Sequence, residues 1–204
     1  MATVRTRIGP ADHGRVMTLE EFWEAEDQPG YRYELVRGVL EVSEVPGDPH
    51  WQIVHNIHEA FSAYHRQHPG VILRIGHGSD VRYIIPELET DRHPDLAIAF
   101  RDAPVGFKGR RQAALAVEVV SPGSEARRRD YKAKREDYLI VGIREYWIVD
   151  PALRRVDVLV RREHEGVAIW AERAFGDGEV IAGELLPGFA ATVSDLWADS
   201  EGEN

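Results

Sequence analysis

Two acidic residues of this chain stand where apolar strands would hold them in the protein interior. Glu118 lies within the apolar run 113–120, which is rich in valine toward its end and is closed by a Ser-Pro-Gly turn. Asp95 opens a second apolar run, residues 96–100. Because an unpaired buried carboxylate is strongly unfavourable, we expect Glu118 to be protonated, ion-paired or bound to a metal.

The chemistry that two such acids favour is that of a magnesium or manganese site. If the two strands are neighbours, the carboxylates of Asp95 and Glu118 and the backbone carbonyl of Val119 could all reach one divalent cation, which prefers hard oxygen ligands. Such a cation activates water and neutralises charge on a phosphoryl group. The alternative is a structural ion pair between Glu118 and a basic residue, and the residues alone leave both open.

A lysine on the following segment could serve the same site. Asp130, Lys134 and Tyr138 are spaced i, i+4 and i+8, so a helix would present them on one face. Lys132 would point about 200° away from Lys134. We therefore predict that Lys134 faces Glu118, where it could orient or deprotonate a water or stabilise transition-state charge.

The sequence gives weaker support for other histidines and acids as residues of the site. Strict strand alternation puts Glu34 on the same face as Val36, which indicates an inward side chain, although an exposed edge-strand acid paired with Arg32 or Arg37 is an equal alternative. His50 opens a long expected helix and could contact phosphate or a metal-bound water. His55 and His58 lack the third ligand that zinc requires, so we interpret them as a solvated or packed face.

The elements around these residues predict a mixed sheet flanked by helices, the α/β class. A Thr18–Glu21 capping box begins a short helix. Polar loops are expected over residues 86–93 and before the Glu118 strand. The other expected helices cover residues 49–68 and 124–141, and the other expected strands cover residues 31–45 (two strands), 71–75, 80–85, 144–149, 156–160, 166–170 and 179–181.

Composition narrows the class of protein. The chain has 204 residues, 43% of them apolar, no cysteine and a net charge of −10. We expect a flexible leader over residues 1–16, one domain over residues 17–198 and an acidic tail over residues 199–204. No signal segment or membrane span is apparent, which favours the cytoplasm. The negative charge argues against a protein that simply coats nucleic acid, but not against a nuclease.

Several motifs taken in order resemble one family. They are Tyr33-Glu34-Leu35, Pro49-His50, Pro94-Asp95-Leu96, Glu118-Val119-Val120-Ser121-Pro122, the Asp130–Lys134–Tyr138 spacing and Glu145-Tyr146-Trp147-Ile148-Val149-Asp150-Pro151. This order resembles the Uma2 family (DUF820), restriction-endonuclease-like proteins of the PD-(D/E)XK superfamily, over roughly residues 17–198.

The resemblance implies a metal-dependent nuclease acting on nucleic acid, DNA in the first instance. Asp95 and Glu118 would be the motif acids and metal ligands, and Glu34 the acid from the N-terminal element. Val120 stands where the superfamily's motif has lysine, and Lys134 would replace that lysine. A non-catalytic nucleic-acid-binding or interaction module is the alternative, and a glycosidase using the two acids is weaker because it leaves Lys134 without a role. Only the general prevalence of symmetric dimers suggests a homodimer.

Overall fold

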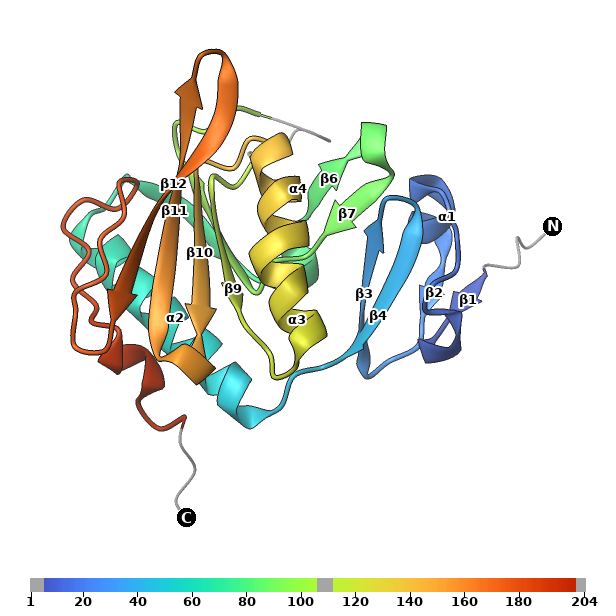
Figure 1. Cartoon of the computed structure of the whole chain (residues 1–204), viewed down its shortest axis with the longest axis horizontal. Coiled ribbons are helices and arrows are strands. Elements are labelled where there is room, and N and C mark those ends of the chain that lie inside the picture. Colours follow the sequence, from blue (N-terminus) through green and yellow to red (C-terminus); the bar gives the residue numbers. More distant parts are fainter. Residues whose placement is uncertain (1–5, 106–111, 201–204) are drawn as a thin grey trace. The chain divides into compact units, whose positions relative to one another are not determined.

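The computed structural model describes residues 6–105 and 112–200. Its contacts divide the chain into two compact units, the first made of Met1–Pro46 and Arg82–His93, the second of Gly47–Val81 and Pro94–Asn204. Figure 1 shows the elements of both units. The single domain expected over residues 17–198 stays a prediction, and each unit is described by itself below. Within the described part of the chain, no helix combines the length and the apolarity needed to cross a bilayer.

The first unit is a small antiparallel sheet with one short helix. The helix, α1 (Leu19–Glu24), begins at Thr18, whose side chain and that of Glu21 form the predicted capping box. Its four-stranded sheet has the order β4-β3-β7-β6. The bounds are β3 Tyr31–Val36, β4 Val39–Glu44, β6 Tyr83–Ile85 and β7 Thr90–Arg92.

Two expectations for this unit were wrong. The leader is ordered from residue 7: β1 (Arg7–Ile8) pairs in parallel with β2 (Glu26–Asp27), and a turn of 3₁₀ helix covers Pro10–Asp12. Ile8 holds this segment in place, because its side chain is fully buried among the apolar residues of the unit. A single buried residue in a segment without hydrophobic periodicity cannot be recognised from the sequence. The remaining leader residues, 1–5, lie outside the described residues.

The second error is the polar loop expected over residues 86–93, which contains β7. All three residues of β7 are buried, and two of them are charged. Asp91 is ion-paired with Arg82, and Arg92 Nη1 lies 3.1 Å from Glu34 Oε2 and 3.0 Å from Glu41 Oε2. Ion pairing therefore lets a polar segment form an interior strand, which a hydrophobicity pattern cannot anticipate.

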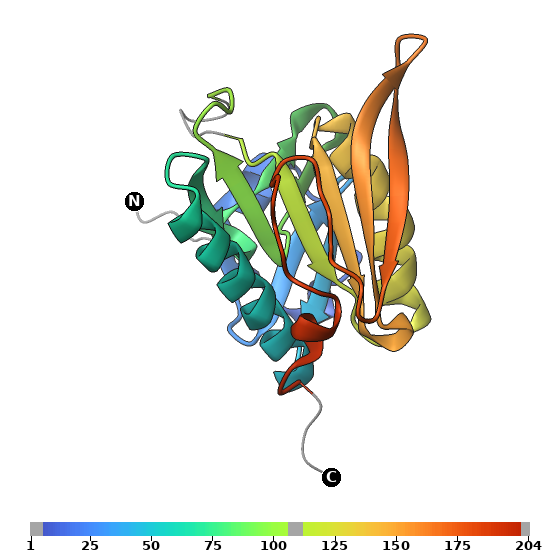
Figure 2. The ribbon, with the colours of Figure 1, turned by 90° about the vertical axis from the view of Figure 1, so that its left-hand side faces the viewer.

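The second unit is built on a six-stranded mixed sheet of order β12-β11-β10-β9-β8-β5. Only β9 and β10 pair in parallel, and every other neighbouring pair is antiparallel. Figure 2 shows the strands of this sheet spread side by side, after a quarter turn from the view of Figure 1. The bounds are β5 Ile72–Gly76, β8 Leu96–Phe100, β9 Leu115–Val119, β10 Glu145–Asp150, β11 Arg155–His164 and β12 Val167–Gly176. The mixed α/β fold predicted from the sequence is confirmed.

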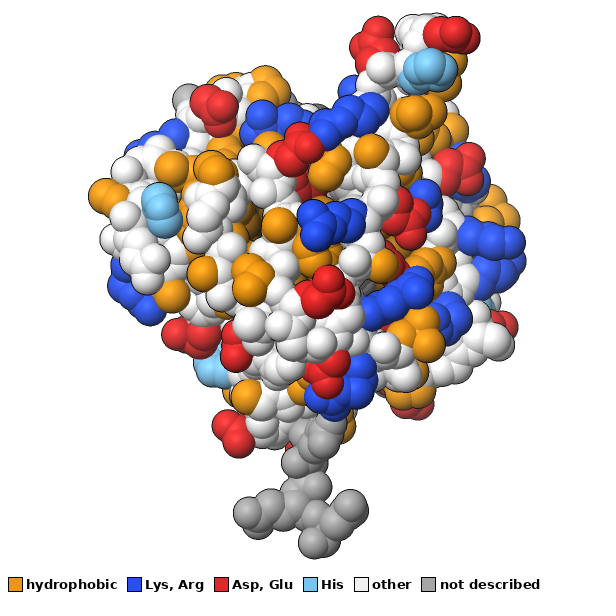
Figure 3. All heavy atoms as spheres, turned by 60° about the vertical axis from the view of Figure 1, so that its left-hand side comes forward, with side chains coloured by type: hydrophobic (Ala, Val, Ile, Leu, Met, Phe, Trp, Pro, Cys, Tyr) orange, Lys and Arg blue, Asp and Glu red, His pale blue; other side chains and the backbone are white. Residues whose placement is uncertain are grey.

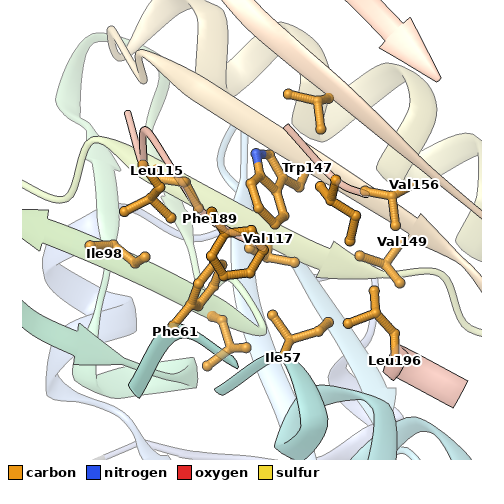
Figure 4. Packing of buried hydrophobic residues seen from close by; sticks show 14 of the residues in the cluster. Ile57, Phe61, Ile98, Leu115, Val117, Trp147, Val149, Val156, Phe189 and Leu196 are labelled. Atoms are coloured by element: carbon orange, nitrogen blue, oxygen red, sulfur yellow. The ribbon is translucent and has the colours of Figure 1, made fainter. Parts of the chain in front are cut away.

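Helices cover both faces of this sheet (Figures 1 and 2). On one face lies α2 (Asp48–Gln67), whose apolar stripe at Ile53, Ile57, Phe61 and Tyr64 is buried. Figure 4 shows Ile57 and Phe61 packed with strand residues that include Val117, Trp147 and Val149, and with Phe189 from the C-terminal segment. This apolar layer is the main hydrophobic core of the unit.

The opposite face carries a helix with an irregular middle. We expected one helix over residues 124–141, and the structure has α3 (Ser124–Arg128), a π-turn (Arg129–Ala133) and α4 (Lys134–Ile140) in direct succession. A π-turn inserts an extra residue into the helical turn and is frequent at functional sites. It lies directly before Lys134.

The other differences concern strand lengths. β11 and β12 form one hairpin with ten residues in each strand, whereas the sequence predicted two shorter strands. The added end of β11, Arg161–His164, is charged or polar and largely exposed, so it leaves no apolar pattern. β6 begins at Tyr83 rather than at residue 80. The strand expected over residues 179–181 is only an isolated bridge between Val180 and Thr192.

Candidate active site

Asp95 and Glu118 come together because their strands are neighbours, as predicted. β8 and β9 pair antiparallel, with Leu96 opposite Val117. Asp95 immediately precedes Leu96 and Glu118 immediately follows Val117, so the two acids lie opposite each other at the same end of this strand pair. Both residues are buried.

Glu118 points to the polar face of the sheet. Strand alternation turns Val117 and Val119 into the apolar core on the α2 side and turns Glu118 to the α3–α4 side. There its Oε1 lies 2.9 Å from Nζ of Lys134 and accepts a 2.5 Å hydrogen bond from the hydroxyl of Tyr138. A cation and a hydroxyl donor thus stabilise the charged form of a carboxylate inside the protein.

Lys134 reaches Glu118 from the first position of α4. It is buried, whereas Lys132 is exposed, so the prediction that only Lys134 faces Glu118 is confirmed. Tyr138 follows one helical turn later on the same face, and its ring packs edge-to-face on Tyr146 of β10. The helix thereby presents an ammonium and a hydroxyl to one carboxylate oxygen.

The Asp95 carboxylate and the Val119 backbone share a donor from α2. Asp95 Oδ2 accepts a hydrogen bond of 2.8 Å from the Val119 N–H. His50 Nε2 lies 3.2 Å from Asp95 Oδ2 and 3.1 Å from the Val119 carbonyl oxygen. Because a carbonyl oxygen can only accept, Nε2 must carry the hydrogen. His50 therefore binds, as a donor, two oxygens that were expected to bind a metal.

Asp130 is a further buried acid beside Lys134. It lies in the π-turn; its Oδ1 is 3.3 Å from Arg129 Nε, and its Oδ2 is buried without a hydrogen-bond partner among the described residues. Burial raises the pKa of the Asp130 carboxyl, and the like charge of Asp95 raises it further, while Lys134 and Arg129 act in the opposite direction. Asp130, Lys134 and Asp95 therefore share one electrostatic environment.

Glu34 belongs to the first unit, where the structure shows it held by two partners. Its Oε1 accepts a 2.7 Å hydrogen bond from the His93 N–H, and its Oε2 is ion-paired with Arg92. The inward placement indicated by strand alternation is confirmed, since Glu34 is buried. Its expected assistance to Asp95 and Glu118 remains a prediction.

The donor set suits a hard divalent cation. Two carboxylates and one carbonyl oxygen are the ligand types that magnesium and manganese prefer. Asp95 Oδ2 and the Val119 oxygen both lie within about 3 Å of the same nitrogen, so they converge on a common point. The described residues contain no group of three or more His, Asp or Glu side chains arranged to hold a metal.

Most basic residues of the α3–α4 segment are engaged inside the unit. Arg127 pairs with Asp150, Arg129 with Asp130 and Arg135 with Glu172, while Arg128 and Lys132 are exposed. The hydroxyl of Tyr131 bonds Asp150 and Asp157, which ties the π-turn to β10 and β11. Burial, followed by these two carboxylates, raises the pKa of Tyr131. The sequence of charges alone could not show which basic residues form structural ion pairs and which lie at the candidate site.

The sheet, its flanking helices and the acids at the strand ends define a restriction-endonuclease-like nuclease fold. Within that class, the chain belongs to the Uma2 family, described as "putative restriction endonuclease", whose family model matches residues 19–194. The chain is also similar to a crystal structure from Anabaena variabilis, titled a "putative nuclease belonging to DUF820". The two share 17% sequence identity with a TM-score of 0.68, over 90% of this chain and 99% of that one, which supports the fold alone. No curated protein matches the chain.

Proposed function

We propose that this protein is a metal-dependent endonuclease that hydrolyses phosphodiester bonds of nucleic acid. The observation that carries the proposal is the ion pair between Lys134 and Glu118 beside Asp95. It supplies, from a helix, the cation that the superfamily's short motif would place two residues after Glu118, where this chain has Val120. A relocated lysine can take part in catalysis only if its helix packs beside the strand, and here it does.

In this proposal Asp95, Glu118 and the Val119 carbonyl would hold magnesium or manganese. The bound cation would supply Lewis-acid stabilisation of a phosphoryl group and a more acidic water. Lys134 orients the attacking water or stabilises the charge that develops on the phosphate oxygens. Tyr138 keeps the Glu118 carboxylate in place through its hydroxyl.

The remaining candidates have supporting roles. His50 orients Asp95 and the Val119 carbonyl through its contacts with the oxygens that would hold the cation. Asp130 lies beside Lys134, whose positive charge stabilises the charged form of the Asp130 carboxyl. Glu34 holds the backbone at His93, two residues before Asp95, and is proposed to assist the metal site.

Nucleic acid, with DNA first, is the proposed partner. Figure 3 shows Lys and Arg side chains interspersed with Asp and Glu side chains on the face it displays. Such a mixed surface, in a chain of net charge −10, favours local contacts near the site over a broad basic groove. Arg128 and Lys132, both exposed on the segment that carries Lys134, are the proposed phosphate contacts. A homodimer stays a prediction.

The test is a cleavage assay joined to a metal titration. Purified protein is incubated with single- and double-stranded DNA and RNA, with magnesium, manganese or EDTA. We expect cleavage with metal only, and a rise in melting temperature with metal that Glu118→Gln abolishes. Glu172→Gln, which changes a partly exposed acid paired with Arg135, is the matched control. No cleavage of any substrate, together with identical melting curves with and without metal, would refute the proposal.

One observation favours the second candidate, a nucleic-acid-binding module without catalysis. The His50 donor already satisfies Asp95 Oδ2 and the Val119 oxygen, so these groups are stable without a cation. This candidate predicts nucleic-acid binding that is unchanged by EDTA and by Glu118→Gln. The titration above separates the two candidates, because only the nuclease requires a metal-dependent melting shift.

A further inference from the structure

A row of aromatic rings lies on the solvent side of α2, on a flank different from its apolar stripe. Trp51, His55 and His58 are spaced i, i+4 and i+7, so they occupy one side of the helix. His77, from the segment after β5, adds a fourth ring. We call these four side chains the aromatic row. They have no part in the hydrophobic core.

The rings of the aromatic row are stacked in pairs. Trp51 and His55 lie with their ring centroids 5.3 Å apart and their planes within 3°, and His58 and His77 lie 5.2 Å apart with planes within 10°. Trp51 is 61% exposed. Tryptophan is usually highly buried, because its large apolar surface is unfavourable in water. An indole held flat by a histidine and left open to solvent is therefore suited to receive another flat ring.

The row begins beside the candidate active site. Trp51 directly follows His50, which contacts Asp95 Oδ2 and the Val119 oxygen. Adjacent Cα atoms are about 3.8 Å apart, so the backbone of Trp51 lies next to that of the site's histidine in the first turns of α2. A polymer bound at the site would therefore pass the part of the helix that carries the exposed indole.

We propose that the aromatic row binds unpaired bases of a single-stranded nucleic acid, with Trp51 as the principal stacking residue. The inference rests on the proposed function, since continuity with that site identifies the occupant. A base in a duplex has both faces covered by its neighbours, whereas an unpaired base offers a free face to an indole. Stacking of a base on an aromatic side chain contributes about 1–3 kcal/mol and tolerates any base.

In this proposal the bases stack at the Trp51–His55 end of the row. At the other end, Glu59 Oε1 lies 3.6 Å from His58 Nδ1, and this carboxylate repels nearby phosphates. The substrate class that follows is single-stranded nucleic acid, or a duplex locally opened next to the bond to be cut. DNA and RNA share this chemistry, and the test below separates them.

The test measures binding without cleavage. Fluorescein-labelled 15-nucleotide oligo(dU) and oligo(U), and a 15-base-pair duplex, are titrated with full-length protein in EDTA and followed by anisotropy. We expect Trp51→Ala to weaken binding of a single strand by about 5- to 150-fold, the range that corresponds to one stacked base. Trp51→Phe should keep most of the affinity. Val167→Ala, at an equally exposed apolar residue of the β12 hairpin, should match the wild type.

The outcomes distinguish this inference from the proposed function. Equal affinity of Trp51→Ala and wild type for both single strands, or wild-type binding of the duplex alone, overturns the inference. Binding that depends on Trp51, in a protein that cleaves nothing with any metal, supports the stacking surface and refutes the nuclease. Because oligo(dU) and oligo(U) differ only in the sugar, tighter binding of one of them identifies the nucleic acid that the row accompanies.

Discussion

Two buried glutamates stand at opposite ends of the parallel strand pair β9–β10, and they serve different purposes. Glu145 begins β10, and Glu118 lies near the end of β9. Glu145 Oε1 accepts a 2.6 Å hydrogen bond from Trp147 Nε1, and Oε2 accepts bonds of 2.8 Å and 3.1 Å from the N–H groups of Glu184 and Leu185. Glu118 instead meets the ammonium of Lys134 and the hydroxyl of Tyr138.

The comparison teaches that burial alone does not mark a catalytic acid. Glu145 is surrounded by neutral donors from the protein itself and holds the 184–185 backbone against the sheet. Gly183 fits this arrangement, because a Cβ at that position would collide with the Glu145 carboxylate. Burial raises the pKa of Glu145, and its three hydrogen bonds lower it again. Glu118, by contrast, sits among charged groups from separate segments, as reaction centres do.

Replacing Glu118 should have the largest effect on activity. We expect Glu118→Gln to reduce cleavage by about 1,000-fold or more, since the Lewis-acid contribution of a bound metal is several kcal/mol. It should also lower stability by about 3 kcal/mol, because Lys134 keeps a buried, unpaired charge. The double variant Glu118→Gln/Lys134→Met should regain stability but not cleavage in a paired melting and cleavage assay. Recovery of both would show that the ion pair is only structural.

Lys134 is expected to rank second. Lys134→Met should reduce the cleavage rate at saturating metal by about 100-fold, the usual loss for one preorganised group that stabilises transition-state charge. Metal should still raise the melting temperature, because Asp95 and Glu118 remain. An unchanged cleavage rate in single-turnover kinetics would exclude a role for Lys134 in the reaction.

Glu145 is the matched contrast. Glu145→Ala leaves three buried donors without an acceptor, and we expect a loss of about 2–4 kcal/mol in the free energy of unfolding. Urea unfolding measures this loss. At temperatures where the variant is still folded, its cleavage rate should equal that of the wild type, and metal should raise its melting temperature by the same amount. A variant that loses metal binding while it remains folded would contradict the division between the two glutamates.

The smallest expected effect is that of Asp130 on the pH dependence of stability. Because burial raises its pKa in the folded state above the ordinary value of 3.8, the folded protein keeps this proton to higher pH than the unfolded chain does. Stability from this group is thus present at low pH and is lost as the pH rises through that window. Asp130→Asn cannot titrate, so its melting temperature relative to wild type should increase from pH 4 to pH 8. A constant difference would argue against a raised pKa.

Much of this site could be predicted from the sequence, because strand and helix periodicity determine which side chains share a face. Alternation in β9 separated Glu118 from Val117 and Val119, and the four-residue spacing identified Lys134 over Lys132. The π-turn was not predictable, since no residue type in residues 129–133 signals it. The buried polar strand β7 was missed because its interior position depends on partners distant in the sequence.

The π-turn before Lys134 makes the effect of a change in chain length depend on where the change falls. The turn accommodates one residue more than an ordinary helical turn, so deleting a single residue between 129 and 133 would let a regular helix form and leave α4 in register. Each residue advances a regular helix by about 100°, so a deletion between Lys134 and Tyr138 would instead rotate the hydroxyl away from the carboxylate that the ammonium contacts. Among relatives, a one-residue gap within 129–133 is therefore compatible with the same arrangement of side chains, whereas a gap inside α4 is not.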